Sequence, residues 1–195
     1  MTPSLMTEAP DVGLAEEAAD QADLAWLASG SDEALGRIIR RWNCRLLGFA
    51  QRYLQDRASA EEAVAQAFVR LHVHRGRFRP DSRLSGWLFT TTANLCRNQL
   101  RWRKRHSYRS LEEAPPASVT DARTPATQAA DAERLELLRL ALLALPHEDR
   151  TVILLSHYEG LSHREIAHVL ETTEKSVESR LYRVRRVLSE SLRNR

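Results

Sequence analysis

The residues best suited to chemistry are arginine, lysine, serine and threonine side chains near the C-terminus, between Thr173 and Arg186. Arginine can donate two hydrogen bonds to one guanine, and serine or threonine can bind either a base or a phosphate. This combination favours contact with DNA over catalysis. The residues expected to make that contact are Thr173, Lys175, Ser176, Glu178, Ser179, Arg180, Tyr182, Arg183 and Arg186.

The surrounding pattern predicts a helix-turn-helix from Leu161 to Arg186. Ser162 and Glu165 have the spacing of a capping box, which satisfies free amides at a helix start. A second helix is expected after the turn at residues 171–173, with its first turns in the DNA major groove. The alternative is an ordinary helical hairpin whose arginines face solvent. The capping box, the small Ala167 at the helix crossing and the basic run favour the helix-turn-helix, which by itself indicates only DNA binding.

A net charge of +3 conceals a strong segregation of charge along the chain. Residues 1–33 hold 8 acidic side chains and no lysine or arginine, whereas residues 34–110 hold 17 basic side chains and 4 acidic ones. A second basic zone, residues 175–195, has 7 basic side chains and 2 acidic ones. Two separate basic zones predict two contacts with a polyanion, for which the phosphate backbone of nucleic acid is the usual partner.

Helical spacing of apolar residues and an aromatic content of only 6% predict an all-α fold. We expect two small helical domains joined by a flexible linker, the second being the helix-turn-helix domain. Residues 1–20 are expected to be a mobile acidic tail, and residues 21–106 form the first domain. The linker is residues 107–130, which contain three prolines and no apolar period. Residues 131–195 form the second domain.

Within the first domain, a short helix around Leu24 and Leu27 precedes a long helix that reaches Ala50. A capping box at residues 59–62 predicts a third helix, from Ser59 to about Arg75. A break at residues 76–82 is followed by a long helix that ends in a basic run at residues 101–106. In the second domain, Pro146 is expected in the first turn of a helix, which ends near residue 159.

Other classes of site lack support in the sequence. No apolar run approaches the roughly 18 residues that a membrane span needs, so the chain is expected in the cytoplasm without membrane insertion. Cys44 and Cys96 lack metal-ligand spacing and are expected to be buried thiols. His72 and His74 would lie on different faces of a helix. No cofactor, metal site or catalytic residue is therefore predicted.

Several segments together resemble the extracytoplasmic-function (ECF) group of the sigma-70 family. Residues 60–68, Ala-Glu-Glu-Ala-Val-Ala-Gln-Ala-Phe, are similar to the segment that binds the clamp of core RNA polymerase. The strand-opening segment is similar to residues 78–81, 87–90 and 94–98. The family's C-terminal domain is similar to residues 145–150, 159–162, 165–167 and 177–181. The order and spacing of these segments make the resemblance more specific than any single motif.

The resemblance implies an alternative sigma factor, not an enzyme, whose partners are core RNA polymerase and promoter DNA. The first domain would be region 2, which binds polymerase and melts the minus-ten element. The second would be region 4, which reads the minus-thirty-five element. An anti-sigma protein that covers both faces until it is released is a further implied partner. The polymerase-binding residues would be Glu61, Glu62, Ala65, Gln66 and Phe68.

Melted DNA must be held by a basic track, by apolar or aromatic surfaces and by a pocket for an unstacked base. The break before the long helix and the helix itself carry such groups. They are Arg77, Phe78, Arg79, Arg83, Asn94, Arg97, Asn98, Arg101, Arg103, Lys104 and Arg105. Trp87 suits either a core anchor or a stacking platform.

Three positions depart from the family's pattern. Gln66 stands where an acidic residue is usual, which predicts weaker affinity for polymerase. Glu171 stands at a turn position where glycine is usual; a left-handed backbone there would cost about 1 kcal/mol. Glu178 replaces a common basic residue and would repel phosphate, although it could accept a hydrogen bond from a cytosine amine. We therefore expect an unusual promoter sequence.

Two other classes of protein are compatible with parts of the pattern. A stand-alone transcription regulator with an N-terminal sensor or dimerisation domain would bind duplex DNA without polymerase and leave a symmetric footprint. An enzyme acting on nucleic acid would need a catalytic cluster. Glu61 and Glu62 are adjacent, so on a helix they point about 100° apart, and no other metal-binding side chain accompanies them.

Overall fold

The computed structural model describes residues 12–78, 82–106 and 125–193. Within these ranges the chain forms eight α-helices and one 3-10 helix, with no strand, which confirms the predicted all-α fold. None of the described helices is long and apolar enough to cross a membrane. Residues 1–11 of the expected tail and residues 107–124 of the expected linker lie outside the described residues.

The first domain is built around the long amphipathic helix α2. It contains α1 (Val12–Ala28), α2 (Asp32–Leu54), α3 (Arg57–Val73), the 3-10 helix η1 (Arg75–Arg77) and α4 (Leu84–His106). One face of α2 is buried at helical spacing through Ile38, Trp42, Leu46, Phe49 and Tyr53. Phe89 of α4 packs edge-to-face against two of these rings, with centroids 6.0 Å from Trp42 and 5.5 Å from Phe49. This aromatic cluster fixes α4 against α2.

In the second domain, a buried arginine joins two helices. It contains α5 (Pro125–Ala144), α6 (His147–His157), α7 (His163–Val169) and α8 (Glu174–Arg193). Arg150 of α6 donates hydrogen bonds to the carbonyl oxygens of Leu142 at 2.8 Å, Leu145 at 3.2 Å and Leu143. Carbonyl groups at a helix end lack partners within the helix, and burying them unpaired is costly. A single guanidinium therefore satisfies the end of α5 and ties it to α6.

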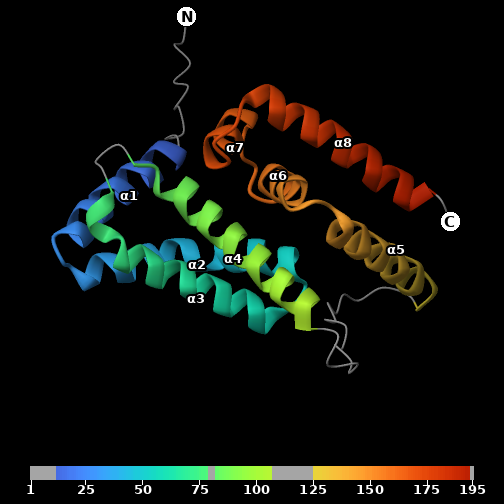
Figure 1. The fold of residues 1–195 in the computed structure, drawn as a ribbon, viewed down its shortest axis with the longest axis horizontal. Helices are drawn as coiled ribbons and strands as arrows, with labels where there is room; N and C mark the ends of the chain where they lie inside the picture. Colours follow the sequence, from blue (N-terminus) through green and yellow to red (C-terminus); the bar gives the residue numbers. More distant parts are fainter. Residues whose placement is uncertain (1–11, 79–81, 107–124, 194–195) are drawn as a thin grey trace, which may run out of the picture.

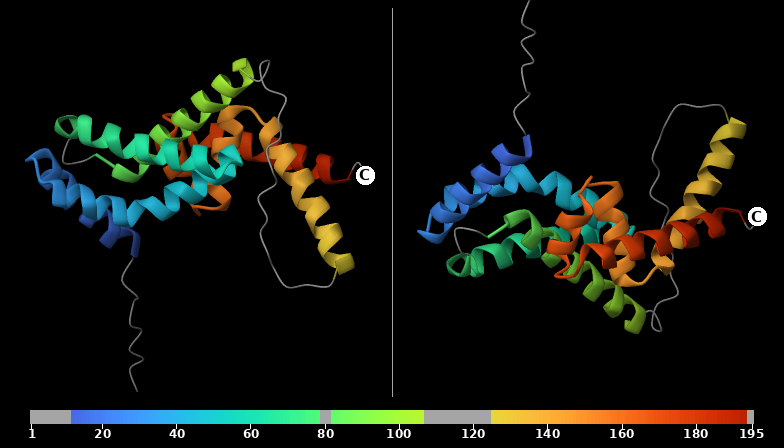
Figure 2. Two further views of the ribbon diagram at one scale, coloured as in Figure 1. Left: turned by 90° about the horizontal axis from the view of Figure 1, so that it is seen from below. Right: turned by 90° about the horizontal axis from the view of Figure 1, so that it is seen from above.

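The two domains pack directly against each other (Figures 1 and 2). α6 lies against α2, and α7 lies against α4. One cluster of buried apolar residues runs from Leu24 in α1 to Leu181 in α8 and includes members of both domains. Away from this contact, α5 and the C-terminal half of α8 extend beyond the first domain. In the described chain the two domains therefore share one continuous apolar core.

The first helix begins earlier than the sequence predicts. Residues 12–20, expected in the mobile tail, form the first half of α1. Buried Asp20 accepts hydrogen bonds from Arg41 at 2.5 Å and from Trp42 Nε1 at 3.0 Å, and Asp23 pairs with Arg37 at 2.6 Å. Burial raises the pKa of Asp20, against the opposing effect of these donors. The prediction of a tail is wrong from residue 12 onward. Residues 12–20 lack apolar periodicity, but Glu16, Glu17 and Asp20 form ion pairs with arginines of other segments.

Two helix starts differ from the prediction. The N-cap of α3 is Asp56, not Ser59: its Oδ2 accepts from the amide of Ser59 at 2.9 Å. A carboxylate at a helix start is a stronger acceptor than a hydroxyl, and the hydroxyl of Ser59 bonds with Arg103 instead. α5 begins at Pro125, inside the expected linker, because proline suits a first helical turn.

Two other predictions also need correction. Pro146 is the N-cap of α6 and so precedes its first turn, and α6 ends at His157. Cys96 is buried as expected, but Cys44 is exposed. Cys44 follows the buried Trp42 by two residues, which places it on the opposite side of α2.

The N-cap of α3 leads to a stability prediction. Asp56→Ala should lower the free energy of unfolding by about 1 kcal/mol, because it removes the cap and the partner of Arg103, 2.5 Å away. Hydrogen bonds from Ser59 lower the pKa of Asp56 below 3.8. Its contribution is therefore fully present above this unfolded-state pKa and is lost as the pH falls through the lower folded-state pKa.

Urea unfolding followed by circular dichroism measures both effects. The control is Ser59→Ala, which removes a hydroxyl from the same helix start and should cost less at neutral pH. The difference in the free energy of unfolding between wild type and Asp56→Ala should become smaller as the pH falls below about 4. A larger loss in Ser59→Ala than in Asp56→Ala would restore Ser59 as the N-cap.

Candidate nucleic-acid interface

The predicted helix-turn-helix is present, and α7 begins with the predicted capping box. Ser162 Oγ accepts from the amide of Glu165 at 3.3 Å, and Glu165 Oε2 accepts from the amide of Ser162 at 2.8 Å. The hydroxyl of Ser162, which donates to Glu165 Oε2 at 2.7 Å, and the amide of Ser162 lower the pKa of Glu165. Ile166, Ala167 and Val169 are buried. The first helix of the motif is thus fixed locally by its cap and globally by its apolar face.

The turn between α7 and α8 carries the expected strain. Glu171 has φ 50°, in the left-handed region that favours glycine. The amide of Thr172 donates to the carbonyl of Ala167 at 2.9 Å, which closes the end of α7. The amide of Ser176 then donates to Thr173 Oγ1 at 3.2 Å and starts α8. Glu171 therefore occupies its turn at a cost of about 1 kcal/mol, and neighbouring hydrogen bonds hold it there.

α8 presents polar residues outward over a buried apolar face. Val177, Leu181 and Val184 are buried, as the spacing predicts. Of the residues expected to contact DNA, Ser176 and Arg180 are half-buried. The exposed ones are Thr173, Lys175, Glu178, Ser179, Tyr182, Arg183 and Arg186. The solvent side of this helix is therefore available for a groove contact.

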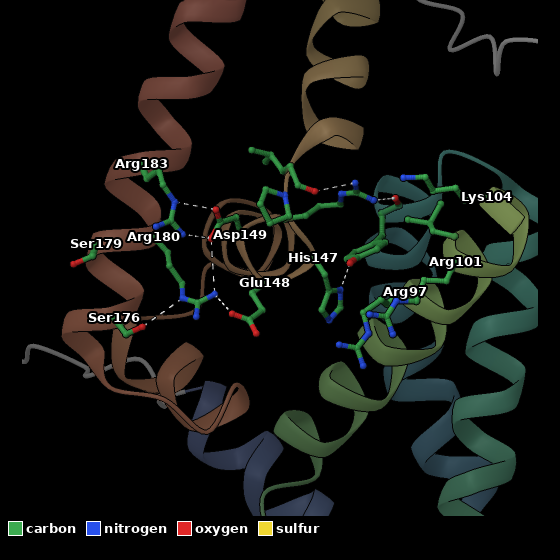
Figure 3. Close-up of a pocket in the computed structure, with 15 residues that line it drawn as sticks. Arg97, Arg101, Lys104, His147, Glu148, Asp149, Ser176, Ser179, Arg180 and Arg183 are labelled. Carbon is green, nitrogen blue, oxygen red and sulfur yellow. Dashed lines mark hydrogen bonds and ion pairs between the residues drawn. The ribbon is translucent and has the colours of Figure 1, made fainter.

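Two of the arginines of α8 are paired with carboxylates of α6 that the sequence analysis did not single out (Figure 3). Arg183 binds the buried Asp149 through two hydrogen bonds of 2.6 and 3.0 Å, and Asp149 raises the pKa of Arg183. Arg180 pairs with Glu148 and lies 3.8 Å from Asp149. Acidic residues favour the first turn of a helix, so the sequence could have predicted Glu148 and Asp149 at the start of α6. Their contact with α8 could not be predicted from the sequence, because it depends on how α6 and α8 pack.

α4 carries the second row of predicted DNA contacts. Arg97, Arg101 and Lys104 line a cleft of about 820 Å³, and Arg180 and Arg183 of α8 line the same cleft. Asn94 lines a neighbouring cavity, while Asn98 and Arg105 are exposed elsewhere on α4. Arg103 is turned away from the cleft, because it pairs with Asp56 at 2.5 Å.

Another cavity, of about 740 Å³, lies between two walls. One is formed by the start of α4 and the residues before it, and the other by α7 and the turn that follows it. Arg77, Phe78 and Arg83 line it together with Trp87. The rings of Phe78 and Trp87 meet edge-to-face with centroids 5.2 Å apart. Trp87 is half-buried and packs against the core cluster, so it is both a core contact and part of the cavity wall. Arg79 lies outside the described residues.

The residues expected to bind polymerase adjoin an apolar groove between α2 and α3. Ala65 and Glu61 line this groove, and the buried Phe68 contributes to it. Glu62 and Gln66 are exposed on the same helix, where Gln66 donates to Glu62 at 3.0 Å. Sequence reasoning missed the other wall, formed by Leu35, Ile39 and Leu47 of α2. Their helical spacing predicts only that they lie on a long helix. The packing of α3 beside them forms the groove.

Comparison with known proteins agrees with this arrangement. The model of the family "Sigma-70 region 2" matches residues 38–106, and that of "Sigma-70, region 4" matches residues 135–188. RNA polymerase sigma factor CarQ of Myxococcus xanthus is 35% identical over 142 residues, covering 70% of this chain and 76% of CarQ. The chain belongs to the sigma-70 family.

Further relatives place it in the ECF group of that family. The ECF RNA polymerase sigma factor SigM of Mycobacterium tuberculosis strain H37Rv is 29% identical over 185 residues, covering 94% of this chain and 90% of SigM. A solved structure of CnrH in complex with the cytosolic domain of CnrY is 28% identical with a TM-score of 0.67, covering 89% of this chain and 97% of CnrH. The chain is thus an alternative sigma factor that directs transcription initiation. A stand-alone regulator is disfavoured, because both sigma regions are present.

Proposed function

We propose that the two domains divide promoter recognition between a duplex and a melted strand. In this proposal the second domain reads the minus-thirty-five element as duplex, and the first domain opens and holds the minus-ten element. The observation that carries the proposal is α8, whose buried apolar face leaves polar side chains exposed over its first three turns. A second basic surface on α4 supplies the other contact. The chain would supply recognition and leave nucleotide chemistry to the polymerase.

α8 is suited to enter a major groove. The exposed Lys175, Ser179 and Arg183 lie within its first three turns, where a recognition helix meets base edges. Arg180 and Arg183 would exchange the carboxylates of α6 for guanine or phosphate acceptors. The exposed Glu178 would favour cytosine, because a carboxylate accepts from its amine. Glu178 would thus give the motif a preference for cytosine at one position, which a helix with only basic side chains lacks.

The first domain is suited to hold an unpaired strand. The cavity beside Phe78 and Trp87 combines aromatic walls with the guanidinium groups of Arg77 and Arg83. A base released from its stack needs an apolar pocket, and its phosphates need neighbouring cations. Asn94 lines a cavity further along α4 and can both donate to and accept from a base edge. These groups support strand capture in this part of the molecule.

The apolar groove between α2 and α3 is proposed as the polymerase contact. Its walls of leucine, isoleucine, valine and phenylalanine suit an apolar helical surface, and Glu61 at the rim suits a basic one. The amide of Gln66 lacks a charge, which predicts a weaker ionic contribution there. CnrH was solved with a protein partner, CnrY, and we propose a comparable anti-sigma partner for this chain. Its place of action would be the cytoplasm, where polymerase and promoters are found.

The decisive experiment is transcription from a supercoiled genomic library with purified core polymerase, with and without this protein. New start sites that depend on the protein are expected. Sequencing the transcripts would also give the promoter elements for the assays below. A protein that footprints DNA alone and adds no start site would contradict the proposal.

Arg180 is expected to act in upstream recognition. Arg180→Ala should weaken binding of the polymerase complex to its promoter by about 1–3 kcal/mol and relax the sequence requirement at one upstream position. The matched control is Arg193→Ala, which removes the same charge about 20 Å further along α8. Footprinting and competition binding measure the difference. Equal losses in the two variants would reduce Arg180 to a general electrostatic contact.

Asn94 is expected to act in opening. Asn94→Ala should leave binding of the closed complex near the wild-type level and reduce melting of the minus-ten element, because a base contact is lost. Permanganate reactivity of thymines reports melting directly. The control is Gln51→Ala, an exposed amide on α2. Unchanged permanganate reactivity in Asn94→Ala would remove this residue from the opening machinery.

A further inference from the structure

The guanidinium group of Arg183 in α8 is held by one edge only. Its Nε donates to Asp149 Oδ2 at 3.0 Å, and its Nη2 donates to Asp149 Oδ1 at 2.6 Å (Figure 3). A guanidinium has five N–H donors, so this pairing leaves both donors of Nη1 and one of Nη2. Within the part of the chain that the structure describes, Nη1 has no acceptor. The edge formed by Nη1 and Nη2 carries the two parallel donors that guanine accepts at O6 and N7.

The carboxylate that holds this guanidinium is buried. The side chain of Asp149 is only 4% exposed, whereas that of Arg183 is 54% exposed. Removing the partner of a buried carboxylate leaves an unpaired charge, which is strongly destabilising. We therefore expect Asp149 to keep Arg183 when α8 meets another acceptor. The exposed part of the arginine is then the part that reaches the acceptor.

Arg180 is held differently. Its partner Glu148 is 61% exposed, and Arg180 Nη1 lies 3.8 Å from Asp149 Oδ1. Water can replace an arginine at an exposed carboxylate at little cost, because such ion pairs contribute little to stability. The exchange of carboxylate for DNA acceptors proposed above is thus needed for Arg180. Arg183 can bind its carboxylate and a base at the same time.

Asp149 is itself fixed by the helix that carries it. It lies in the first turn of α6, where the free amides of the helix favour a carboxylate. The next residue, Arg150, ties this turn to α5 by donating to the carbonyl oxygen of Leu142 at 2.8 Å. A side chain that is fixed in this way can set the direction of another side chain that it binds through two hydrogen bonds.

We propose that Asp149 is a positioning residue for promoter recognition, which orients Arg183 so that its free edge meets one guanine of the minus-thirty-five element. This role rests on the function proposed for α8 above. An unpaired arginine side chain loses rotamer freedom when it binds DNA, and this loss weakens binding. Asp149 imposes the order before DNA arrives. It also fixes the plane of the guanidinium, so a base without the two acceptors of guanine is rejected.

Base preference at single positions tests this role. Duplexes in which each base pair of the minus-thirty-five element is changed singly compete for the complex of this protein with core polymerase. Arg183→Ala identifies the base pair that Arg183 reads, because discrimination there should fall about 10-fold. Asp149→Asn keeps the size of the side chain and removes its charge. It should lower discrimination several-fold at that same base pair and leave the other positions unchanged.

A double variant separates positioning from folding. Because Asp149 acts through Arg183, Asp149→Asn combined with Arg183→Ala should discriminate no worse than Arg183→Ala alone. A carboxylate that only stabilised the fold would weaken binding to every duplex equally, and its effect would add to that of Arg183→Ala. Either of these two results would overturn the positioning role.

Two further variants keep the test decisive if Asp149→Asn unfolds. Arg183→Lys keeps the charge, but an ammonium has no second edge, so discrimination should fall as far as in Arg183→Ala. Glu136→Gln is the matched control, because Glu136 binds Arg139 of α5 through the same two nitrogens, Nε at 2.6 Å and Nη2 at 2.5 Å. Full discrimination in Arg183→Lys, or an equal loss in Glu136→Gln, would also overturn the proposal.

The same competition assay distinguishes failure of this inference from failure of the proposed function. If the wild-type complex shows no base preference in any upstream element, the function proposed for α8 is wrong and the role of Asp149 falls with it. If wild type discriminates but Arg183→Ala or Asp149→Asn changes no preference, only the positioning role is overturned.

Discussion

Four consecutive side chains in the first turn of α6 together contact three other helices, α2, α5 and α8. Successive residues of a helix point about 100° apart, so His147, Glu148, Asp149 and Arg150 face four directions. His147 meets Tyr53 of α2, the two carboxylates meet arginines of α8, and Arg150 meets the carbonyl groups that end α5. Arg150 also donates to the carbonyl of Tyr53 at 3.4 Å. This turn sets where the recognition helix lies relative to both domains.

The carboxylates of this turn also reduce the repulsion between basic side chains of α4 and α8. Two basic surfaces repel each other when they approach, and the cleft between α4 and α8 is lined by two arginines and a lysine of α4 and by two arginines of α8. Asp149 is buried against Arg183, and Glu148 pairs with Arg180, so part of this charge is neutralised within the cleft. DNA phosphates would compete for the same guanidinium groups.

The contact between the domains combines an apolar centre with polar edges. Val169 and Leu155 belong to the same buried cluster as Phe89, which favours docking. Around it lie single hydrogen bonds and ion pairs, such as Thr90 with Val169 and Arg45 with Glu159. The apolar groove between α2 and α3 lies outside this contact, since all of its lining residues belong to these two helices.

The sequence by itself determined the features that depend on neighbouring residues. The capping box of Ser162 and Glu165 and the buried stripe of Val177, Leu181 and Val184 follow from spacing of a few residues. A left-handed turn at Glu171 was suggested by the resemblance to the family, in which glycine is usual at that position. The sequence also shows two separate basic zones, because the position of each charged residue along the chain does not depend on the fold. It misplaced the start of α3, since Asp56 and Ser59 both suit an N-cap and only the position of Arg103 distinguishes them.

Tertiary structure alone decided the features that join distant residues. Asp149 and Arg183 are separated by 34 positions, Arg45 and Glu159 by 114, and no periodic pattern connects such pairs. The first half of α1, which lacks apolar spacing, is joined to α2 by the pairs of Glu16 with Arg45 and of Asp20 with Arg41. The helix-turn-helix was therefore predictable, but its position against α4 was not. Capping and periodicity act within one helix, whereas the packing of domains depends on which surfaces fit once all the helices have formed.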